Sequence, residues 1–300
     1  MHHAIVKYND IPIKQLICDL NWVAKSPALL AIAPPQVSWS LLSANYFSNC
    51  ADWLIEIEKH PADLIAFFDS GQQFILGKYF EKHLGFIFKY FEGVSLIASG
   101  LQVEMNKRTI GEIDFVLKHL TSGKITQLEV AVKYYMGYGA SAKHTMWIGP
   151  NGMDNLEGKI QKFSTQLSMA GFSQQLADLN PATFEKKVLL KGYFFKHISS
   201  KLLPHFNNQV VLTGKWLYIS ELGKTMVADS TFMILPKRYW LGFCFDKNLE
   251  RYSGTKIVEA VHSEIQRVGK GILMAELDEE AQRITTKYMV VPDYWPKLKG

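Results

Sequence analysis

The sequence has little cysteine and no long apolar run. Its three cysteines, Cys18, Cys50 and Cys244, are widely spaced and form no CxxC pair. A disulfide framework or a zinc site is therefore not expected, and a reducing cytoplasm suits the chain. Nowhere do about 18 apolar residues follow one another, so no membrane span is expected. The N-terminal stretch MHHAIVKYNDIPIK also lacks the apolar core of a signal peptide.

Charge is low, and several signature motifs of enzymes are missing. Charged residues make up 20% of the 300 residues and apolar residues 48%, which predicts a folded protein of one large domain or two ordinary ones. The net charge of +5 permits binding to phosphate backbones without requiring it. We find no GxSxG elbow, no GxxxxGK[ST] loop and no dinucleotide fingerprint, which argues against the commonest serine hydrolases and nucleotide-binding folds.

The order of periodic segments predicts an α/β protein with a mixed sheet flanked by helices. Residues 1–70 have helical spacing, and apolar residues along 73–91 fall on one helical arc. Strands are predicted at VSLIASGLQVEM and in a hairpin over 109–135, followed by a glycine-rich connection, a helix within 153–171 and a strand over 186–198. The last third has strand-like KWLYI, STFMILP and YWLGFCF and one amphipathic helix over 254–271, and TKYMVVPDYWP closes the chain. We expect three regions: helical 1–70, a core over 71–200 and an α+β extension over 201–300.

The predicted hairpin carries ionisable side chains at matching parity. Side chains alternate between the faces of a strand, so Glu112 and Asp114 share one face, and Glu129 shares a face with Lys133. A tight turn at Ser122-Gly123 would place Asp114 opposite Ala131, and Glu112 opposite Lys133. All four groups would then lie on one surface. An ordinary wet sheet face with a cross-strand ion pair is the alternative interpretation. Against that alternative, Glu81 lies at the edge of the preceding apolar helical arc, where an unpaired carboxylate is costly.

These stretches resemble the PD-(D/E)XK nuclease superfamily, which includes restriction endonucleases and Holliday-junction resolvases. GKYFEKHL resembles its first core helix, GEIDF the strand with its metal-binding Asp, and LEVAVKYY the strand with its (D/E)-X-K element. The resemblance implies a restriction-endonuclease-like αβββαβ core completed by VLLKGYFF. The combination of GEIDF, EVAVK and WIGP is also similar to an uncharacterised bacterial family assigned to that superfamily.

The resemblance implies a nuclease site that uses Mg²⁺ or Mn²⁺. Asp114 would bind the metal with Glu129, Glu112 or Glu81, and Lys133 would orient the attacking water or stabilise the phosphate. The substrate would be nucleic acid, with DNA as the expected one. The superfamily places its second acid two residues before the lysine, where this chain has Ala131, so Glu129 or Glu112 would have to replace it.

The helix after the glycine-rich connection offers further candidates. Lys159, Lys162 and Gln166 lie where the superfamily brings polar residues near the scissile phosphate, although the sequence pattern favours a solvated helix face. Asp154 with Glu157 predicts a capping box at the start of this helix.

Two other functions compete with the enzyme. A catalytically inactive protein of the same fold would bind nucleic acid or a partner protein, and Ala131 favours this alternative. An unrelated α/β binding protein would carry these carboxylates only as a wet face.

Overall fold

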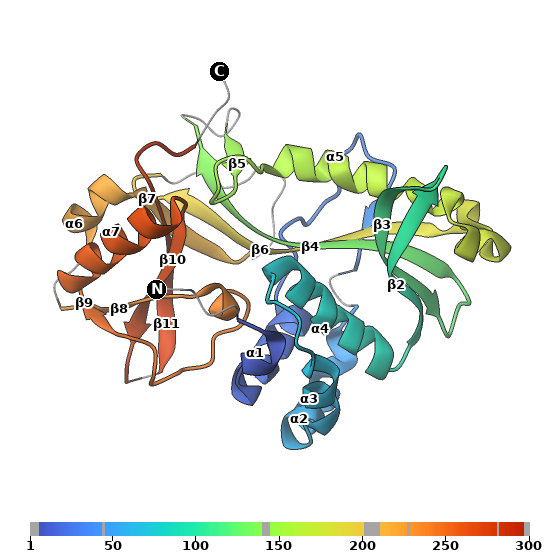
Figure 1. Ribbon diagram of the computed structural model, residues 1–300, viewed down its shortest axis with the longest axis horizontal. Helices are drawn as coiled ribbons and strands as arrows, with labels where there is room; N and C mark the ends of the chain where they lie inside the picture. The colour runs from blue at the N-terminus through green and yellow to red at the C-terminus, as the bar shows by residue number, and fades with distance from the viewer. Residues whose placement is uncertain are drawn as a thin grey trace. The chain divides into compact units, whose positions relative to one another are not determined.

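The computed structural model describes residues 6–43, 46–139, 145–200, 211–226, 229–280 and 282–296. The protein is a mixed α/β protein with two compact units (Figure 1). The first unit comprises Met1–Val132 and Lys159–Lys191, and the second comprises Lys133–Gly158 and Gly192–Gly300. Two long strands, β4 (Ile125–Tyr138) and β6 (Glu185–His197), begin in the first unit and end in the second.

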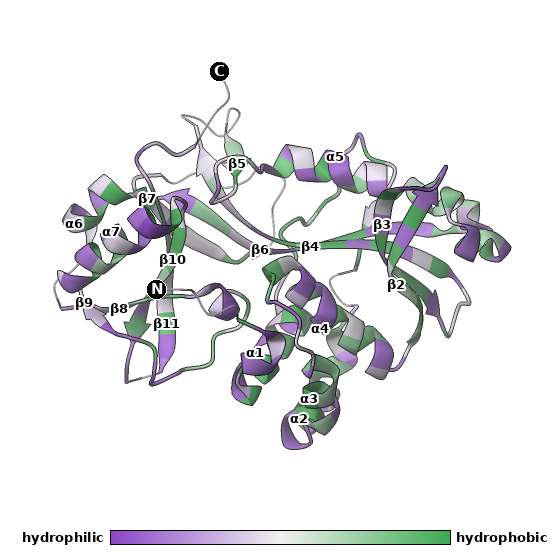
Figure 2. Cartoon of the chain, in the orientation of Figure 1, coloured by the Kyte–Doolittle hydropathy of each residue, from purple (hydrophilic) through white to green (hydrophobic). Residues whose placement is uncertain are grey.

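The first unit contains the predicted N-terminal helices and the aromatic helix that follows them. These are α1 (Ile13–Lys25), α2 (Ala51–Lys59), α3 (Ala62–Phe68) and α4 (Leu76–Tyr90). On α4 the predicted apolar arc is buried, with Phe80, Leu84 and Ile87 at 0% exposure. Figure 2 shows that α4 carries both hydrophilic and hydrophobic residues, as expected for a helix with one buried face.

The sheet of the first unit has the strand order β2-β3-β4-β6. Its first two strands are β2 (Val94–Met105) and β3 (Arg108–His119), and the short β1 (Ser40–Leu41) pairs with β6 in parallel. On one face, Phe88 of α4 packs on Phe115 of β3 with ring centroids 5.1 Å apart. On the other face, Gln127 of β4 donates to the Gln166 carbonyl at the end of α5 (Leu156–Gln166). The two helices therefore cover opposite faces (Figure 1).

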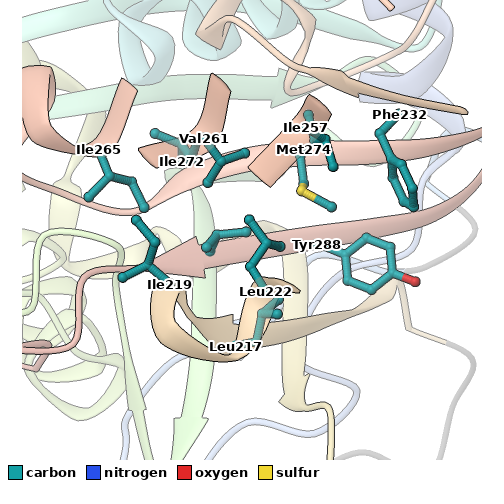
Figure 3. Close-up of a cluster of buried hydrophobic side chains, with 11 residues drawn as sticks. Leu217, Ile219, Leu222, Phe232, Ile257, Val261, Ile265, Ile272, Met274 and Tyr288 are labelled. Carbon is teal, nitrogen blue, oxygen red and sulfur yellow. The ribbon is translucent and has the colours of Figure 1, made fainter. Parts of the chain in front are cut away.

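The second unit is built on a mixed sheet with the strand order β6-β7-β11-β10-β8-β9. The additional strands and helices are β5 (Met146–Ile148), β7 (Thr213–Tyr218), β8 (Thr231–Ile234), β9 (Tyr252–Ser253), β10 (Ile272–Asp278), β11 (Arg283–Val291), α6 (Leu222–Thr225) and α7 (Lys256–Val268). Ile257, Val261 and Ile265 project from α7 onto this sheet (Figure 3). Their spacing of four residues gives the helix one apolar stripe.

Two expectations for the connecting segments are wrong. YWLGFCF is not a strand: the 3₁₀ turn Lys237–Tyr239 is followed by irregular chain, in which Trp240 is buried. Tyr134 donates to the Trp240 carbonyl at 2.5 Å, and the Trp240 indole donates to the Leu235 carbonyl at 2.9 Å. Side-chain hydrogen bonds therefore satisfy these two carbonyls without a neighbouring strand. The glycine-rich connection also contains a short strand, β5, paired with the end of β4.

No helix within the described ranges combines the length and the apolar character that a membrane crossing requires.

Candidate functional site

The β3–β4 hairpin has a different register from the one predicted. Phe115 is opposite Leu128 and Lys118 is opposite Ile125, so the same ladder continued brings Asp114 level with Glu129, not Ala131. The difference arises in the turn. His119 and Gly123 donate to the carbonyls of Lys124 and His119, respectively, so the loop is Leu120–Gly123 and not a tight turn at Ser122-Gly123. Gly123 has φ +68, which glycine adopts without strain in this longer loop as well.

The side chain of Asp114 takes the place of a backbone acceptor in the hydrogen-bond ladder between β3 and β4. Its Oδ2 accepts the backbone N–H of Val130 at 2.8 Å, and only 8% of the residue is exposed. Backbone N–H groups of a strand point toward the neighbouring strand within the sheet. The carboxylate is therefore held in the gap between β3 and β4, where groups from helices on either face can reach it.

Three predicted metal ligands converge at this point. Glu81 of α4 joins Glu112 and Asp114 of β3, and one carboxylate oxygen from each lies within 4.8 Å of the other two. Lys78, one helical turn before Glu81, extends its ammonium group into the same cluster, 2.7 Å from Glu81 and 2.6 Å from Glu112. Gln102 on β2 donates to the other oxygen of Glu112 at 2.5 Å. The three acids were predicted from the sequence, whereas Lys78 was not, because a lysine three residues before a glutamate is common on exposed helix faces.

The pKa values of this cluster reflect burial of like charges. Burial raises the pKa of Glu81, against a hydrogen bond from Lys78, and the charge of Asp114 raises it further. Burial also raises the pKa of Asp114, although the Val130 N–H and the charges of Lys159 and Lys78 act in the opposite direction. Burial lowers the pKa of Lys78, but its bonds to Glu112 and Glu81 outweigh that effect and raise it. The site therefore favours an added positive charge.

Glu129 is the most deeply buried acid of the group. It is 0% exposed, and burial together with the charge of Asp114 raises its pKa to about 9. Its Oε1 accepts a 3.4 Å hydrogen bond from Gln127, whereas its Oε2 has no partner among the described residues. The side-chain oxygens of Gln127 and Gln166 are likewise buried and accept no hydrogen bond from the residues that the structure describes. Buried acceptors normally have a donor, a water or a cation beside them, so the two amide oxygens, and Glu129 once it has lost its proton, favour a cation or water in this region.

Of the three predicted nucleic-acid-binding residues, two reach the acidic cluster. The charge of Lys159 lowers the pKa values of both Asp114 and Glu129, and its ammonium lies 3.9 Å from the Phe163 ring centroid. Gln166 links the helix to the sheet, since its Nε2 donates to the Glu112 carbonyl at 3.5 Å. Lys162 is exposed to solvent.

Lys133 belongs to the second unit, where it is already paired. Its ammonium lies 2.6 Å from Oδ2 of Asp154. The predicted cap of α5 is therefore wrong: Asn155, not Asp154, accepts the Gly158 N–H at 2.8 Å as the N-cap. An ion pair explains Asp154 better than a cap does. The candidate site in the first unit consists of Lys78, Glu81, Glu112, Asp114, Glu129 and Lys159; a catalytic role for Lys133 stays a prediction.

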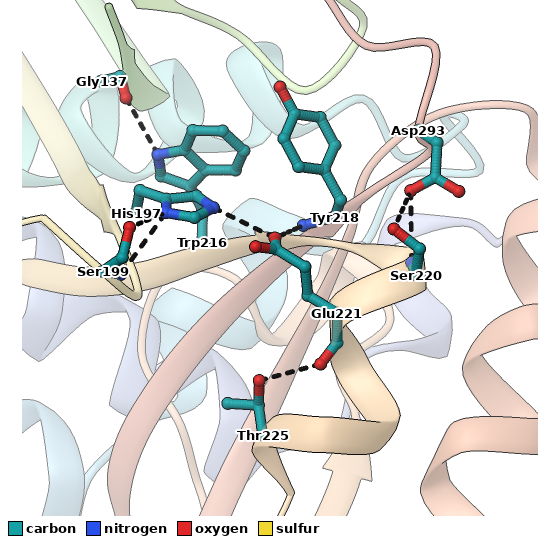
Figure 4. Close-up of polar contacts among 9 residues, drawn as sticks. All are labelled: Gly137, His197, Ser199, Trp216, Tyr218, Ser220, Glu221, Thr225 and Asp293. Carbon is teal, nitrogen blue, oxygen red and sulfur yellow. Dashed lines mark hydrogen bonds and ion pairs between the residues drawn. The ribbon is translucent and has the colours of Figure 1, made fainter. Parts of the chain in front are cut away.

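A second polar group lies in the second unit (Figure 4). His197 bonds Ser199 Oγ at 2.7 Å through Nδ1 and Glu221 Oε2 at 3.0 Å through Nε2. The same Glu221 oxygen accepts the Tyr218 N–H at 2.8 Å, which closes the 3₁₀ turn Ile219–Glu221 after β7. Ser199 is exposed and only two positions from His197 in the chain. These contacts attach the end of β6 to the end of β7, and we assign them a structural role.

Comparison with known proteins gives one match. The family model described as Domain of unknown function (DUF1853) matches residues 18–291, which include every residue of the candidate site. No curated protein and no solved structure matches the chain.

Proposed function

The chain belongs to the DUF1853 family, and we propose that it is a metal-dependent nuclease that hydrolyses phosphodiester bonds in nucleic acid. The proposal includes a restriction-endonuclease-like core, which the order of the long elements α4, β2, β3, β4, α5 and β6 supports, with the short β5 added between β4 and α5. The observation that carries it is the convergence of Glu81 from α4 with Glu112 and Asp114 from β3, whose oxygens approach within 4.8 Å.

The donor set suits Mg²⁺ or Mn²⁺. Both ions prefer carboxylate oxygens, and two oxygens on one Mg²⁺ ion are at most about 4.2 Å apart, twice the Mg–O distance. The three acids, with oxygens up to 4.8 Å apart, need only a small rotation to meet that limit. Binding also requires Lys78 to leave its place between Glu81 and Glu112. Half of the Lys78 side chain is exposed, so the ammonium can swing into water.

The chain's own groups have distinct parts in this proposal. A bound divalent ion would lower the pKa of a coordinated water and offset charge on the phosphate. Asp114, fixed by the Val130 N–H, orients the ligand set. Glu129 retains a proton at neutral pH because its pKa is about 9, and it can release that proton when positive charge arrives. Lys159, whose charge acts on Asp114 and Glu129, would bind the phosphate of the substrate.

A second function is favoured by two other observations. Lys78 already neutralises Glu81 and Glu112 as a built-in cation, and Ala131 stands where the superfamily has its second acid. A catalytically inactive protein that binds nucleic acid would keep both features.

The test is cleavage of labelled single-stranded and double-stranded DNA and RNA with Mg²⁺, with Mn²⁺ and with EDTA. We expect metal-dependent cleavage by the wild type, reduced at least about a hundredfold in Asp114→Asn, because that change removes a charged ligand. Glu58→Gln, an exposed change on α2, is the matched control and should cleave normally. Equal cleavage by Asp114→Asn would contradict the role given to the acidic cluster. Binding of nucleic acid by the wild type without any cleavage would contradict the nuclease and leave the binding protein.

A further inference from the structure

A groove of about 670 Å³ lies on the first unit beside the acidic cluster. One wall is the edge strand β2 with the turn to β3, and the other is the segment that joins two 3₁₀ helices, Met169–Phe172 and Gln174–Leu179. Figure 1 shows β2 at the end of this unit's sheet. The side chains used below are Gln102, Asn106, Lys107, Phe172, Gln174 and Gln175.

The groove and the acidic cluster share a wall. Gln102 lines the groove and donates to Glu112 Oε2 at 2.5 Å. Gly100 lines it too, and a Cβ at that position would lie 3.6 Å from Glu112 Oε1. A molecule that occupies the groove therefore lies next to the carboxylates that would act on its phosphate.

The groove is lined by the kinds of groups that recognise unpaired bases. Besides Gln102, which is bonded to Glu112, three lining residues have amide side chains, which carry a donor and an acceptor together, as the edges of nucleobases do. Phe172 is 54% exposed at the groove, so a base can reach its ring and stack on it. Lys107 adds a positive charge that can contact the phosphate backbone, beside the negative charge of Glu104, which also lines the groove.

Lys107 also occupies a strained backbone position. The turn Asn106-Lys107 has φ +51 and +61, and such turns favour glycine at the second position. A lysine in the left-handed region is destabilising relative to glycine. Its presence there is explained if the ammonium group serves a purpose in the adjacent groove.

We propose that this groove binds the unpaired bases of single-stranded nucleic acid and presents the adjoining phosphate to the acidic cluster. The proposal rests on the nuclease function for its biological meaning, but the binding itself needs no metal. Duplex bases are stacked and paired, so they can neither stack on Phe172 nor present their pairing edges to the amides. The volume of about 670 Å³ is enough for one or two nucleotides.

The test is fluorescence anisotropy of the full chain with a labelled mixed-sequence oligonucleotide, single-stranded or in duplex, in EDTA. We expect the single strand to bind at least about fivefold tighter than the duplex. Phe172→Ala should weaken single-strand binding about tenfold, and Phe172→Trp should retain it. Leu120→Ala is the matched control, because Leu120 is another exposed apolar residue of this unit, 62% exposed, outside the groove.

Lys107→Gly should change folding stability and nucleic-acid binding in opposite directions. Glycine relieves the positive φ, so the melting temperature should rise. Loss of the charge should weaken single-strand binding about threefold and reduce its salt dependence by about one phosphate contact. A decrease in melting temperature with unchanged binding would contradict the role given to Lys107.

Different experimental results would contradict the groove proposal and the nuclease proposal. Unchanged single-strand binding in Phe172→Ala, or duplex binding as tight as single-strand binding, would overturn the groove proposal, whatever the cleavage assay shows. Phe172-dependent binding of the single strand in EDTA would support the groove. If no metal then produced cleavage, the nuclease would fail and the groove would stand.

Discussion

At the scale of single residues, the site is defined by where acids have been buried. Glu129 is fully buried, and its pKa of about 9 means that it holds a proton near neutral pH. An unfolded chain releases that proton at the ordinary carboxyl pKa. The folded state therefore binds one more proton across the range from the ordinary carboxyl pKa to about pH 9, and stability falls as pH rises through that range.

Glu129→Gln should remove this pH dependence. Glutamine resembles the protonated acid and cannot titrate, so we expect the variant to be more stable than the wild type at pH 8 by at least about 1 kcal/mol. The wild type should lose up to about 1.4 kcal/mol per pH unit through this group, and the variant should not. Urea unfolding in EDTA at pH 6, 7, 8 and 9 measures both. Glu58→Gln should keep the wild-type slope; a Glu129→Gln variant with that same slope would show that Glu129 titrates normally.

Lys78 provides a second test at this scale. Because its ammonium lies between Glu81 and Glu112, it competes with any incoming cation. Lys78→Met removes the competitor and leaves the carboxylates unneutralised, so Mn²⁺ should bind about tenfold tighter to the variant than to the wild type. Isothermal titration calorimetry measures this. Weaker Mn²⁺ binding in Lys78→Met would mean that the lysine supports the ion and does not replace it.

At the scale of elements, a close approach of β4 and β6 limits what the sheet tolerates. Gly192 of β6 has φ +136, and a Cβ there would lie 1.7 Å from the Lys133 carbonyl oxygen. No rotamer can relieve a contact with backbone, so the strands would have to separate. Gly192→Ala should lower the free energy of unfolding by about 3 kcal/mol or more, as seen by urea denaturation. Gly223→Ala, where a Cβ meets nothing within 4 Å, is the control, and a similar loss in both variants would contradict this explanation.

Much of the first unit could be predicted from the sequence, because its periodic patterns are strong. The apolar arc identified α4, and VSLIASGLQVEM coincides with β2, Val94–Met105. Side-chain parity grouped Glu112 with Asp114, and the edge of the arc singled out Glu81. The hairpin register could not be predicted, because Gly123 suits a tight turn and the longer loop equally well. The part played by Lys78 was also hidden, since an exposed helical lysine has no distinctive pattern until the strand beside it is known.

At the scale of the whole molecule, the chain passes between its two units more than once. The second unit combines Lys133–Gly158 with Gly192–Gly300. Side chains join these two segments: the Trp216 indole donates to the Gly137 carbonyl at 3.0 Å, and the Trp295 indole donates to the Gly149 carbonyl at 3.0 Å. The last third of the chain is therefore only part of a compact unit.

A fragment of residues 192–300 should consequently fail to fold alone. It lacks the end of β4 and the whole of β5, and its Trp216 and Trp295 indoles lose their acceptors. We expect poor amide dispersion in its NMR spectrum and no cooperative thermal transition. A dispersed spectrum with a sharp transition would show that this third is an independent domain.

The central claim is that the carboxylates of α4 and β3 form a binding site for a divalent cation. Calorimetric titration of the metal-free protein with Mn²⁺ tests it most directly, with Asp114→Asn as the comparison. The account predicts one Mn²⁺ ion per wild-type chain, with protons released on binding at pH 7 and affinity lost at least tenfold in Asp114→Asn. Absence of saturable binding at millimolar Mn²⁺, or equal binding by Asp114→Asn, would contradict it.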